Sequence, residues 1–519
     1  TAAAKEQGLV AVAAFDLGDI AEFCEKQTSY VDYMFTSLLG EERINQLAEV
    51  VYSGNSSRFW AVQGLINTGD VDKLPNLWLY VGITGLYLLI LGPGLYLFLR
   101  GRGLQNLYRK GVVIVALGFS GLVYVLGIPT RFRSTFYTYA SIEDVTDDYV
   151  TDTTYINIRN PYNRPYTVEL DPGYRLLPIT RSTQYTVSGQ SLDVDAPYQI
   201  AICTGEDALT VKGQNISAFT PRYFRLERRT ENSEKVGITG EVDYFEGQLQ
   251  GSLTNRFPYP IENATLILYG NMVQLGRMEA GETKDLAGYP LLRYPLGDSY
   301  LAAEHISGED TYASADIRNR SYMLAVERSN LTRFYLDSYL TGYTADARVI
   351  AFSTQKEESQ FLKNPSEETY GITMLTQTVP VNASRDHSIY RSVLMKVPRV
   401  NGGSYDAETN SMSGAEPLTL EYQFGTDIEV ESLTFESVSE EFIDTGSGSI
   451  SHIFTGSIYF YNYATGNFDR MELEGTTLNV EQLKPYLSPG NTLTVRYAYN
   501  GSGLDAIQLP MPMVAGRER

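Results

Sequence analysis

The sequence predicts a membrane protein of mixed fold class, in which two transmembrane α-helices precede a mainly β region of tandem sandwiches. Three observations lead to this prediction. Two long uncharged segments lie in the first 130 residues, and the chain after residue 135 alternates apolar and polar residues. A short segment before the helices has the pattern of an α/β domain. The net charge of −21 excludes electrostatic binding of nucleic acid as the main task, because that task needs a basic face.

Residues 1–75 are expected to be the extracytoplasmic end of an α/β domain. Residues 9–15 form a continuous apolar run, which is typical of a buried strand in a parallel sheet. Residues 21–39 and 41–52 have apolar side chains at helical spacing. Because one strand and two helices cannot bury a core, we expect the upstream part of this domain to be missing from the chain.

The membrane prediction rests on residues 77–99 and 111–128, which contain 23 and 18 residues without a charge. At about 1.5 Å per residue, about 20 helical residues cross the hydrocarbon core of a bilayer. A buried core hairpin of a soluble protein is the alternative. Pro93 is expected to kink the first helix, because proline removes a backbone donor. Neither segment contains an Asp, Glu, Lys, Arg or His, which argues against a transporter or a proton pathway.

The orientation follows from the loop at residues 100–110, which carries four cations and no acid. These cations are Arg100, Arg102, Arg109 and Lys110. Because positive charge marks the cytoplasmic side, we expect this loop inside the cell and both larger regions outside, in the cell membrane. Trp78, Tyr80 and Tyr124 are expected to be interfacial aromatic residues. The predicted partners are therefore the lipid bilayer and a protein of a membrane complex.

A resemblance to a known group rests on the sequence GLVAVAAFDL at residues 8–17, followed by two helices, a Gly-Pro-Gly membrane hairpin with a basic turn, and a β-rich region. This order resembles uncharacterised membrane proteins of Gram-positive bacteria. Their extracytoplasmic N-terminal half is similar to a class I glutamine amidotransferase domain that often lacks catalytic residues. The resemblance implies a degenerate domain here. The first histidine is His305, and Cys24 is expected in a helix, so no catalytic residue is transferred.

The β region is expected to contain four units, separated by turn-rich stretches. A sandwich covers residues 133–220, and an immunoglobulin-like sandwich follows at 221–310. Its residues 251–286 resemble accessory domains of bacterial surface proteins. A mixed α/β connection with a helix at 315–340 covers 311–397, and a jelly-roll-like sandwich covers 398–519. The clearest strands are expected at residues 154–159, 166–170, 248–255, 347–353, 418–424, 428–435, 456–463 and 492–499.

The chemistry-bearing residues predict no catalytic, cofactor or metal site. The three histidines are isolated and lack zinc-ligand spacing. Asp444-Thr445-Gly446 resembles the aspartic-protease signature, but that chemistry needs two carboxylates and the chain has no second copy, so we interpret it as a turn. Three further possibilities stay open. They are a Cys24–Cys203 disulfide, calcium binding by the acid pairs Asp147/Asp148 and Asp193/Asp195, and sugar binding by exposed tyrosines of the last sandwich.

The sequence therefore favours a membrane-anchored bacterial surface protein with a non-enzymatic binding or scaffolding role in the cell envelope. An accessory subunit of an ABC-type export complex is the second hypothesis. An envelope glycan or peptide hydrolase is the third, with its site in the missing N-terminal half or in a cleft of a sandwich.

Overall fold

The chain divides into two compact units, residues 1–64 with 178–196 and residues 65–177 with 197–519. In the first unit, β1 (Ala2–Lys5) pairs with β2 (Gly8–Ala11). This pair is antiparallel, so residues 9–11 of the strand expected in a parallel sheet belong to a local hairpin instead. The rest of that strand, most of the helix expected at 21–39 and the helix expected at 41–52 lie outside the described residues. The computed structural model describes residues 2–5, 8–11, 23, 27, 30, 33–34, 36–37, 61–66, 73–179, 200–205, 207–296, 299–308, 317–340, 347–355, 361–364, 368–407, 409–414, 416–425, 428–442, 451–472, 477–501 and 506–518.

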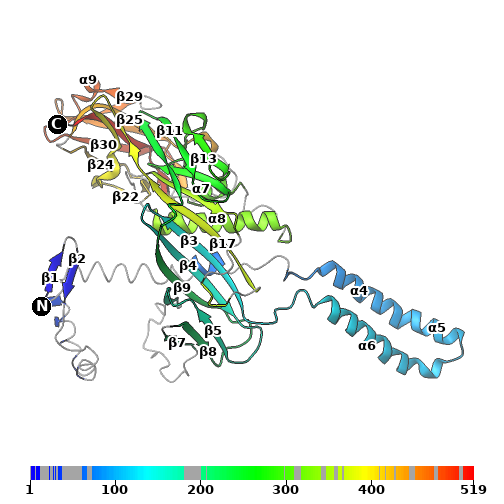
Figure 1. Ribbon diagram of the computed structural model, residues 1–519. Helices are drawn as coiled ribbons and strands as arrows, with labels where there is room; N and C mark the ends of the chain where they lie inside the picture. Colours follow the sequence, from blue (N-terminus) through cyan, green and yellow to red (C-terminus); the bar gives the residue numbers. More distant parts are fainter. Residues whose placement is uncertain are drawn as a thin grey trace. The chain divides into compact units, whose positions relative to one another are not determined.

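The second unit contains a helical hairpin, residues 77–126, which we call the apolar hairpin (Figure 1). Its elements are α4 (Leu77–Leu89), a π-helical turn (Ile90–Gly94), α5 (Leu95–Gly101), a 3-10 turn (Gln105–Leu107) and α6 (Tyr108–Leu126). The turn is shorter than the loop expected from the sequence. Arg100 lies in the last turn of α5, whereas Arg109 and Lys110 belong to the first turn of α6.

A nine-stranded sheet forms the centre of the second unit (Figure 1). Its strands, in spatial order, are β15 (Leu292–Arg293), β13 (Asn271–Met278), β12 (Ile261–Leu268), β16 (Ala347–Ser353), β17 (Thr369–Val379), β3 (Phe136–Val145), β4 (Tyr149–Arg159), β9 (Arg222–Glu231) and β6 (Arg175–Ile179). They come from three stretches, 133–220, 221–310 and 311–397, which the sequence pattern predicts to be separate units. The sheet is mixed, because β17 and β3 run parallel while β16–β17 and β3–β4 are antiparallel.

Both faces of this sheet pack against other elements. Successive side chains along a strand point to opposite faces, so one strand contributes to both layers. On β4, Tyr155 contacts Phe334 of α8 (Arg320–Tyr339), with 5.1 Å between ring centroids. The neighbouring Ile156 and Ile158 point to the opposite face and belong to a separate buried cluster. Two small sheets and a second helix complete the layers. They are β5 (Tyr166–Leu170), β8 (Leu209–Gly213) and β7 (Ile200–Thr204); β14 (Thr283–Asp285), β11 (Gln248–Asn255), β10 (Ile238–Phe245) and β18 (Val381–Asn382); and α7 (Ser299–Ser307).

The C-terminal part is a sandwich-like arrangement of two five-stranded sheets and one four-stranded sheet. The first contains β19 (Ser384–Arg385), β20 (Ser388–Ser392), β32 (Met511–Glu518), β25 (Ile428–Glu436) and β29 (Thr477–Asn479). The second contains β21 (Arg399–Gly402), β24 (Leu418–Gln423), β30 (Thr492–Tyr499), β27 (Gly456–Asn462) and β28 (Asn467–Met471). The third contains β22 (Ser404–Asp406), β23 (Ser411–Ser413), β31 (Ala506–Gln508) and β26 (Ser451–Ile453), and α9 (Val480–Leu483) follows β29.

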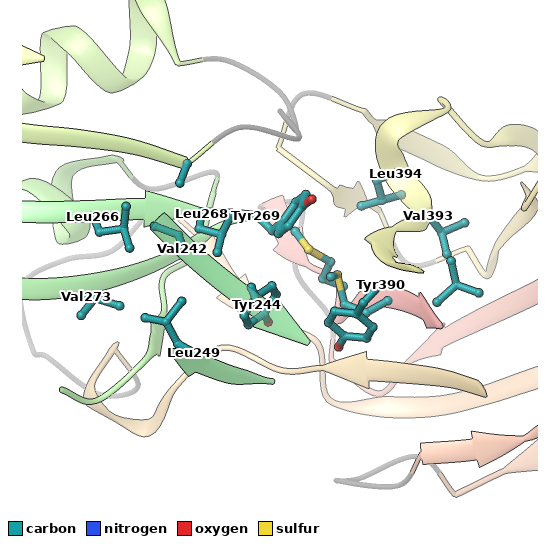
Figure 2. Packing of buried hydrophobic residues seen from close by; sticks show 14 of the residues in the cluster. Val242, Tyr244, Leu249, Leu266, Leu268, Tyr269, Val273, Tyr390, Val393 and Leu394 are labelled. Atoms are coloured by element: carbon teal, nitrogen blue, oxygen red, sulfur yellow. The ribbon is translucent and has the colours of Figure 1, made fainter. Parts of the chain in front are cut away.

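One hydrophobic core joins this C-terminal part to the sheets before it (Figure 2). Tyr244 lies 5.9 Å from Tyr269 and 5.5 Å from Tyr390, measured between ring centroids. Beside these rings, buried Arg293 forms an ion pair with Glu436. Glu436 also accepts hydrogen bonds from the hydroxyls of Tyr244 (3.3 Å) and Tyr390 (2.8 Å). The contact between the C-terminal part and the sheets before it, which we call the junction, is therefore filled by packed aromatic rings and by the Glu436 carboxylate, which has three donors.

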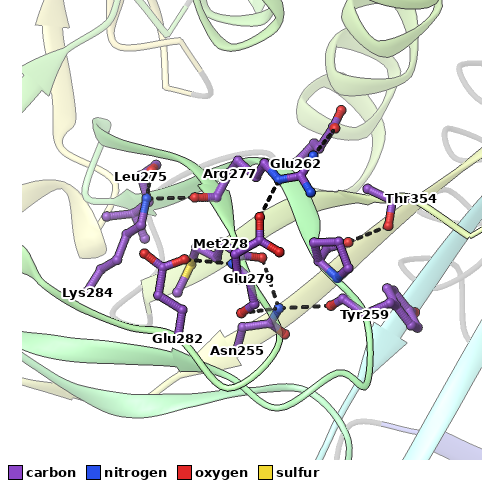
Figure 3. A network of polar contacts seen from close by, with 11 residues as sticks. Asn255, Tyr259, Glu262, Leu275, Arg277, Met278, Glu279, Glu282, Lys284 and Thr354 are labelled. Atoms are coloured by element: carbon purple, nitrogen blue, oxygen red, sulfur yellow. Dashed lines mark hydrogen bonds and ion pairs between the residues drawn. The ribbon is translucent and has the colours of Figure 1, made fainter.

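A second polar network fixes the loops next to β11 and β13 (Figure 3). The side-chain amide of fully buried Asn255 donates to the carbonyl oxygens of Tyr259 (3.1 Å), Met278 (3.2 Å) and Glu279 (3.1 Å). Its oxygen accepts the N–H of Phe257 at 2.9 Å. Because one side chain satisfies backbone groups from two loops, it holds the end of this small sheet against the large one.

Candidate functional site

The apolar hairpin is the most unusual surface of the described chain. Residues 77–101 and 105–126 are each long and apolar enough to cross a membrane. The most apolar 18-residue stretch of each segment is fully accessible, with 0% of it buried. The side chains of Trp78, Ile114 and Leu117 are 78%, 69% and 68% exposed. A soluble monomer seldom exposes a continuous apolar surface of this size. The surface needs an apolar environment.

The two legs of the hairpin contact each other through aromatic side chains. Tyr87 and Phe119 have ring centroids 5.2 Å apart. Nearer the turn, the hydroxyl of Tyr108 donates to the carbonyl oxygen of Leu91 at 3.0 Å. This contact lies in the π-helical turn that contains Pro93, where the proline supplies no backbone N–H. The partner leg therefore supplies a donor to one carbonyl oxygen of the widened turn.

A hollow of about 620 Å³ lies between the legs at their turn end. It is lined by Gly92, Pro93, Tyr96, Leu99, Gln105 and Tyr108. None of these residues is charged, so the lining suits an apolar chain better than a polar metabolite.

The sequence-predicted topology residues lie at both ends of the hairpin. Arg102 lies in the turn, with its guanidinium carbon 4.4 Å from the centroid of the Phe98 ring. At the other end, the guanidinium carbon of Arg131 lies 4.4 Å from the ring centroid of Tyr124, which is 58% exposed. Tyr80 is half-buried. Cations that stack on aromatic rings are suited to the boundary between an apolar layer and water.

The start of the hairpin is attached to the β region by polar contacts that sequence reasoning missed. Lys73 forms an ion pair with Glu368 at 3.3 Å. Arg318 donates to Asn76 Oδ1 at 3.3 Å and to the Pro75 carbonyl oxygen at 3.2 Å. Asn76 is also the N-cap of α4. The two residues of each pair are about 240 to 295 positions apart in the sequence, so no local sequence pattern predicts these contacts.

Further contacts hold the segments on either side of the hairpin. The Thr138 hydroxyl donates to the Ile66 carbonyl oxygen at 2.7 Å, which gives the end of helical residues 61–66 a partner on β3. Phe132 stacks on Phe136 with 3.8 Å between ring centroids. The hairpin therefore leaves the β region from a fixed base.

A buried polar cluster at β4 is the other candidate that the structure offers. Asp152 accepts hydrogen bonds from Ser141 (2.9 Å), Thr154 (2.7 Å) and Tyr174, and Arg228 lies 4.0 Å away. Burial and then the negative charge of Asp152 raise the pKa of Tyr174. Because its donors surround the carboxylate, this cluster supports packing of β4 rather than proton transfer.

The other sequence motifs do not come together as a site. Cys203 is an exposed free thiol, while Cys24, Asp193, Asp195 and Asp444 lie outside the described residues. Asp148 faces Lys235 at 3.4 Å. The ring of His305 packs at a tilt against Phe442, with centroids 5.1 Å apart, and burial lowers the pKa of His305. Within the described ranges, no group of three histidine, cysteine or acidic residues is arranged to hold a metal ion.

Two family models match the β region. Residues 237–382 match a domain of unknown function (DUF8725), and residues 390–516 match another domain of unknown function (DUF8815). Each model covers less than half of the chain. The matched segments run from β10 to β18 and from β20 to β32, so the boundary between them lies beside the tyrosine-lined junction.

No curated protein matches the sequence. Among solved structures, the yeast delta-COP-I mu-homology domain is similar at 6% identity, covering 48% of this chain and 98% of the solved chain, with a TM-score of 0.23. The same domain complexed with a Dsl1 WxWxV peptide gives the same identity and coverage with a TM-score of 0.21. Likeness at these TM-scores supports no inference about this chain.

Proposed function

We propose that this chain is a membrane-anchored component of a bacterial cell envelope, with a non-enzymatic binding or scaffolding role. The apolar hairpin crosses the bilayer, its basic turn lies in the cytoplasm, and the β region lies outside. One observation carries the proposal, namely the continuous exposed apolar surface on both legs of the hairpin. A bilayer removes that surface from water without a protein partner.

The charges at the turn support the orientation. Arg100, Arg102, Arg109 and Lys110 lie within or next to the turn, and no acid accompanies them. Short loops follow the positive-inside rule, whereas large domains are translocated largely regardless of their charge. The basic turn therefore decides the orientation, and the acidic β region does not oppose it.

The exposed thiol of Cys203 allows a direct test of orientation in intact cells. With Cys24→Ser in every variant, a membrane-impermeant maleimide is expected to label Cys203 without permeabilisation. The matched variant adds Cys203→Ser and Asn106→Cys, which moves the only thiol to the turn. Its labelling is expected to require permeabilised cells. The reverse pattern would overturn the orientation, and labelling of both thiols in intact cells would show that the hairpin does not cross the membrane.

Purification in mild detergent separates the scaffolding role from the accessory-subunit role. A lone full-length chain supports the proposal. Stable co-purification with a permease or an ATPase would replace it with the accessory role.

A further inference from the structure

One end of the nine-stranded sheet, which we call the root end, is the place where the hairpin starts and finishes. The first residue of β3, Phe136, pairs with the last residue of β4, Arg159. The first residue of β9, Arg222, pairs with Ile158. The Glu368 carbonyl oxygen before β17 accepts the N–H of Tyr137 at 2.9 Å. The register therefore brings four strand ends together beside the segment that leaves α6.

Two loops complete the root end. The loop at residues 160–165 follows β4, and the loop at residues 214–221 precedes β9. They are joined by backbone contacts, since the N–H of Phe219 donates to the Asn160 carbonyl oxygen at 2.8 Å. Both loops therefore face the side from which the hairpin leaves.

The root end is strongly cationic although the whole chain has a net charge of −21. Among the described residues at this end, the acids are Glu368, which already pairs with Lys73, and Glu327, which is buried and accepts a hydrogen bond from Tyr370 at 2.7 Å. Arg131, Arg133, Arg164, Arg318 and Arg320 are exposed, and Arg159 and Arg222 are half-buried. Such a local reversal of charge is complementary to an anionic surface.

Two exposed aromatic side chains lie among these cations. Phe219 is 54% exposed, and its φ of 62° is a conformation that bulky residues rarely adopt. Its ring centroid lies 6.1 Å from that of Phe136. Tyr162 is 43% exposed, and the guanidinium carbon of Arg164 lies 4.6 Å from its ring centroid. A strained backbone that holds an apolar ring in solvent indicates a contact surface.

We infer that the root end is a second membrane-contact surface, which binds the headgroups of anionic phospholipids. The exposed arginines contact the phosphates, and Phe219 and Tyr162 enter the interfacial layer. The inference rests on the proposed function, because the hairpin brings this end to the bilayer. The root end would hold the β region against the membrane rather than leave it on a free tether.

Hydrogen exchange of the full chain in lipid nanodiscs tests the inference. Exchange in loops 160–165 and 214–221 is expected to be slower in discs that contain phosphatidylglycerol than in discs of phosphatidylcholine alone. The variant Arg131→Glu/Arg133→Glu/Arg164→Glu should remove this difference, because the loss of three cations alone shifts the docking equilibrium by about a hundredfold and the added acids shift it further. The matched control Lys396→Glu/Arg470→Glu/Lys484→Glu changes three exposed cations of the C-terminal sandwich and should retain the difference.

Liposome flotation after carbonate extraction separates this inference from the proposed function. A chain that remains embedded in both lipids, with equal exchange in both, contradicts the root-end inference alone. A chain that carbonate removes from both lipids contradicts the proposed membrane span. An equal loss of protection in the control variant would attribute the effect to net charge rather than to the root end.

Discussion

The apolar hairpin and the β region use similar side chains in opposite ways. In the hairpin, Leu89 and Leu117 are 63% and 68% exposed, whereas Leu266 and Val349 of the large sheet are fully buried. The β region removes its apolar surface from water by pairing layers, and the hairpin has no second layer to do so. The same exposure that would destabilise a soluble sandwich is therefore the property that a bilayer-spanning segment requires.

Arginine in the middle of both hairpin legs should have the largest effect on this contrast. Each arginine costs about 3 kcal/mol in the hydrocarbon core, so the variant Leu89→Arg/Leu117→Arg should lose its carbonate-resistant membrane fraction. The control Val397→Arg alters a side chain with 69% exposure in the β region and should remain in the membrane. If both variants lost the same share of their carbonate-resistant membrane fraction, the loss would not be specific to the hairpin, and the result would contradict its insertion into the bilayer.

Alkaline pH should unfold the β region cooperatively. Burial raises the pKa of Tyr137 from 10.0 to about 12 and also raises the pKa of other buried tyrosines. These are Tyr174, Tyr244, Tyr294, Tyr335, Tyr390 and Tyr497. A folded-state pKa above the unfolded value means that stability is fully present below pH 10 and decreases as the pH rises from there. Each such tyrosine costs about 1.4 kcal/mol per pH unit, so several together remove most of the stability by about pH 11.

Tyrosinate absorbance and circular dichroism check this prediction in detergent. A sharp, simultaneous rise in tyrosinate and loss of strand signal is expected, because ionisation and unfolding are linked. Gradual ionisation centred at pH 10 with the strand signal intact would show that these hydroxyls are not buried as described.

The substitution Arg293→Met tests the junction between the two family-matched segments. It leaves the half-buried Glu436 carboxylate without its buried cation and should lower the free energy of unfolding by about 3–5 kcal/mol. The double variant Arg293→Met/Glu436→Gln should be less destabilised than the sum of the single variants. As a control, Lys235→Met breaks an exposed pair with Asp148 and should cost at most about 1 kcal/mol. Similar losses for the buried and exposed pairs in denaturant titrations would contradict the junction as described.

Local patterns were enough to predict several elements. The strands at 166–170, 248–255, 347–353 and 492–499 have the bounds expected from the sequence, because alternation is visible within one strand. The helix expected at 315–340 is confirmed as α8. The uncharged length of each hairpin leg is an equally local signal.

Long-range pairing could not be predicted in the same way. The parallel pair β3–β17 joins Tyr137 to Thr369 across 232 positions, so no alternation within either strand reveals it. The root end is hidden for the same reason, since the fold brings Arg131, Arg164 and Arg318 to one end of the sheet from three separate stretches of the chain. Charge counted along the chain singles out only the turn of the hairpin, whereas the fold gathers a second group of cations where the hairpin starts and finishes.

Two leucine-to-alanine substitutions provide the finest comparison between the regions. Leu266→Ala deletes a fully buried side chain and should lower the free energy of unfolding of the β region by about 2–5 kcal/mol, because a cavity replaces packed atoms. Leu88→Ala alters a hairpin side chain that is 60% exposed and should leave the unfolding of the β region unchanged. Denaturant titration in detergent, followed by the strand signal, measures both. If Leu88→Ala destabilised the β region as strongly as Leu266→Ala, the hairpin would be part of the same cooperative core, and its exposed leucines would no longer require lipid.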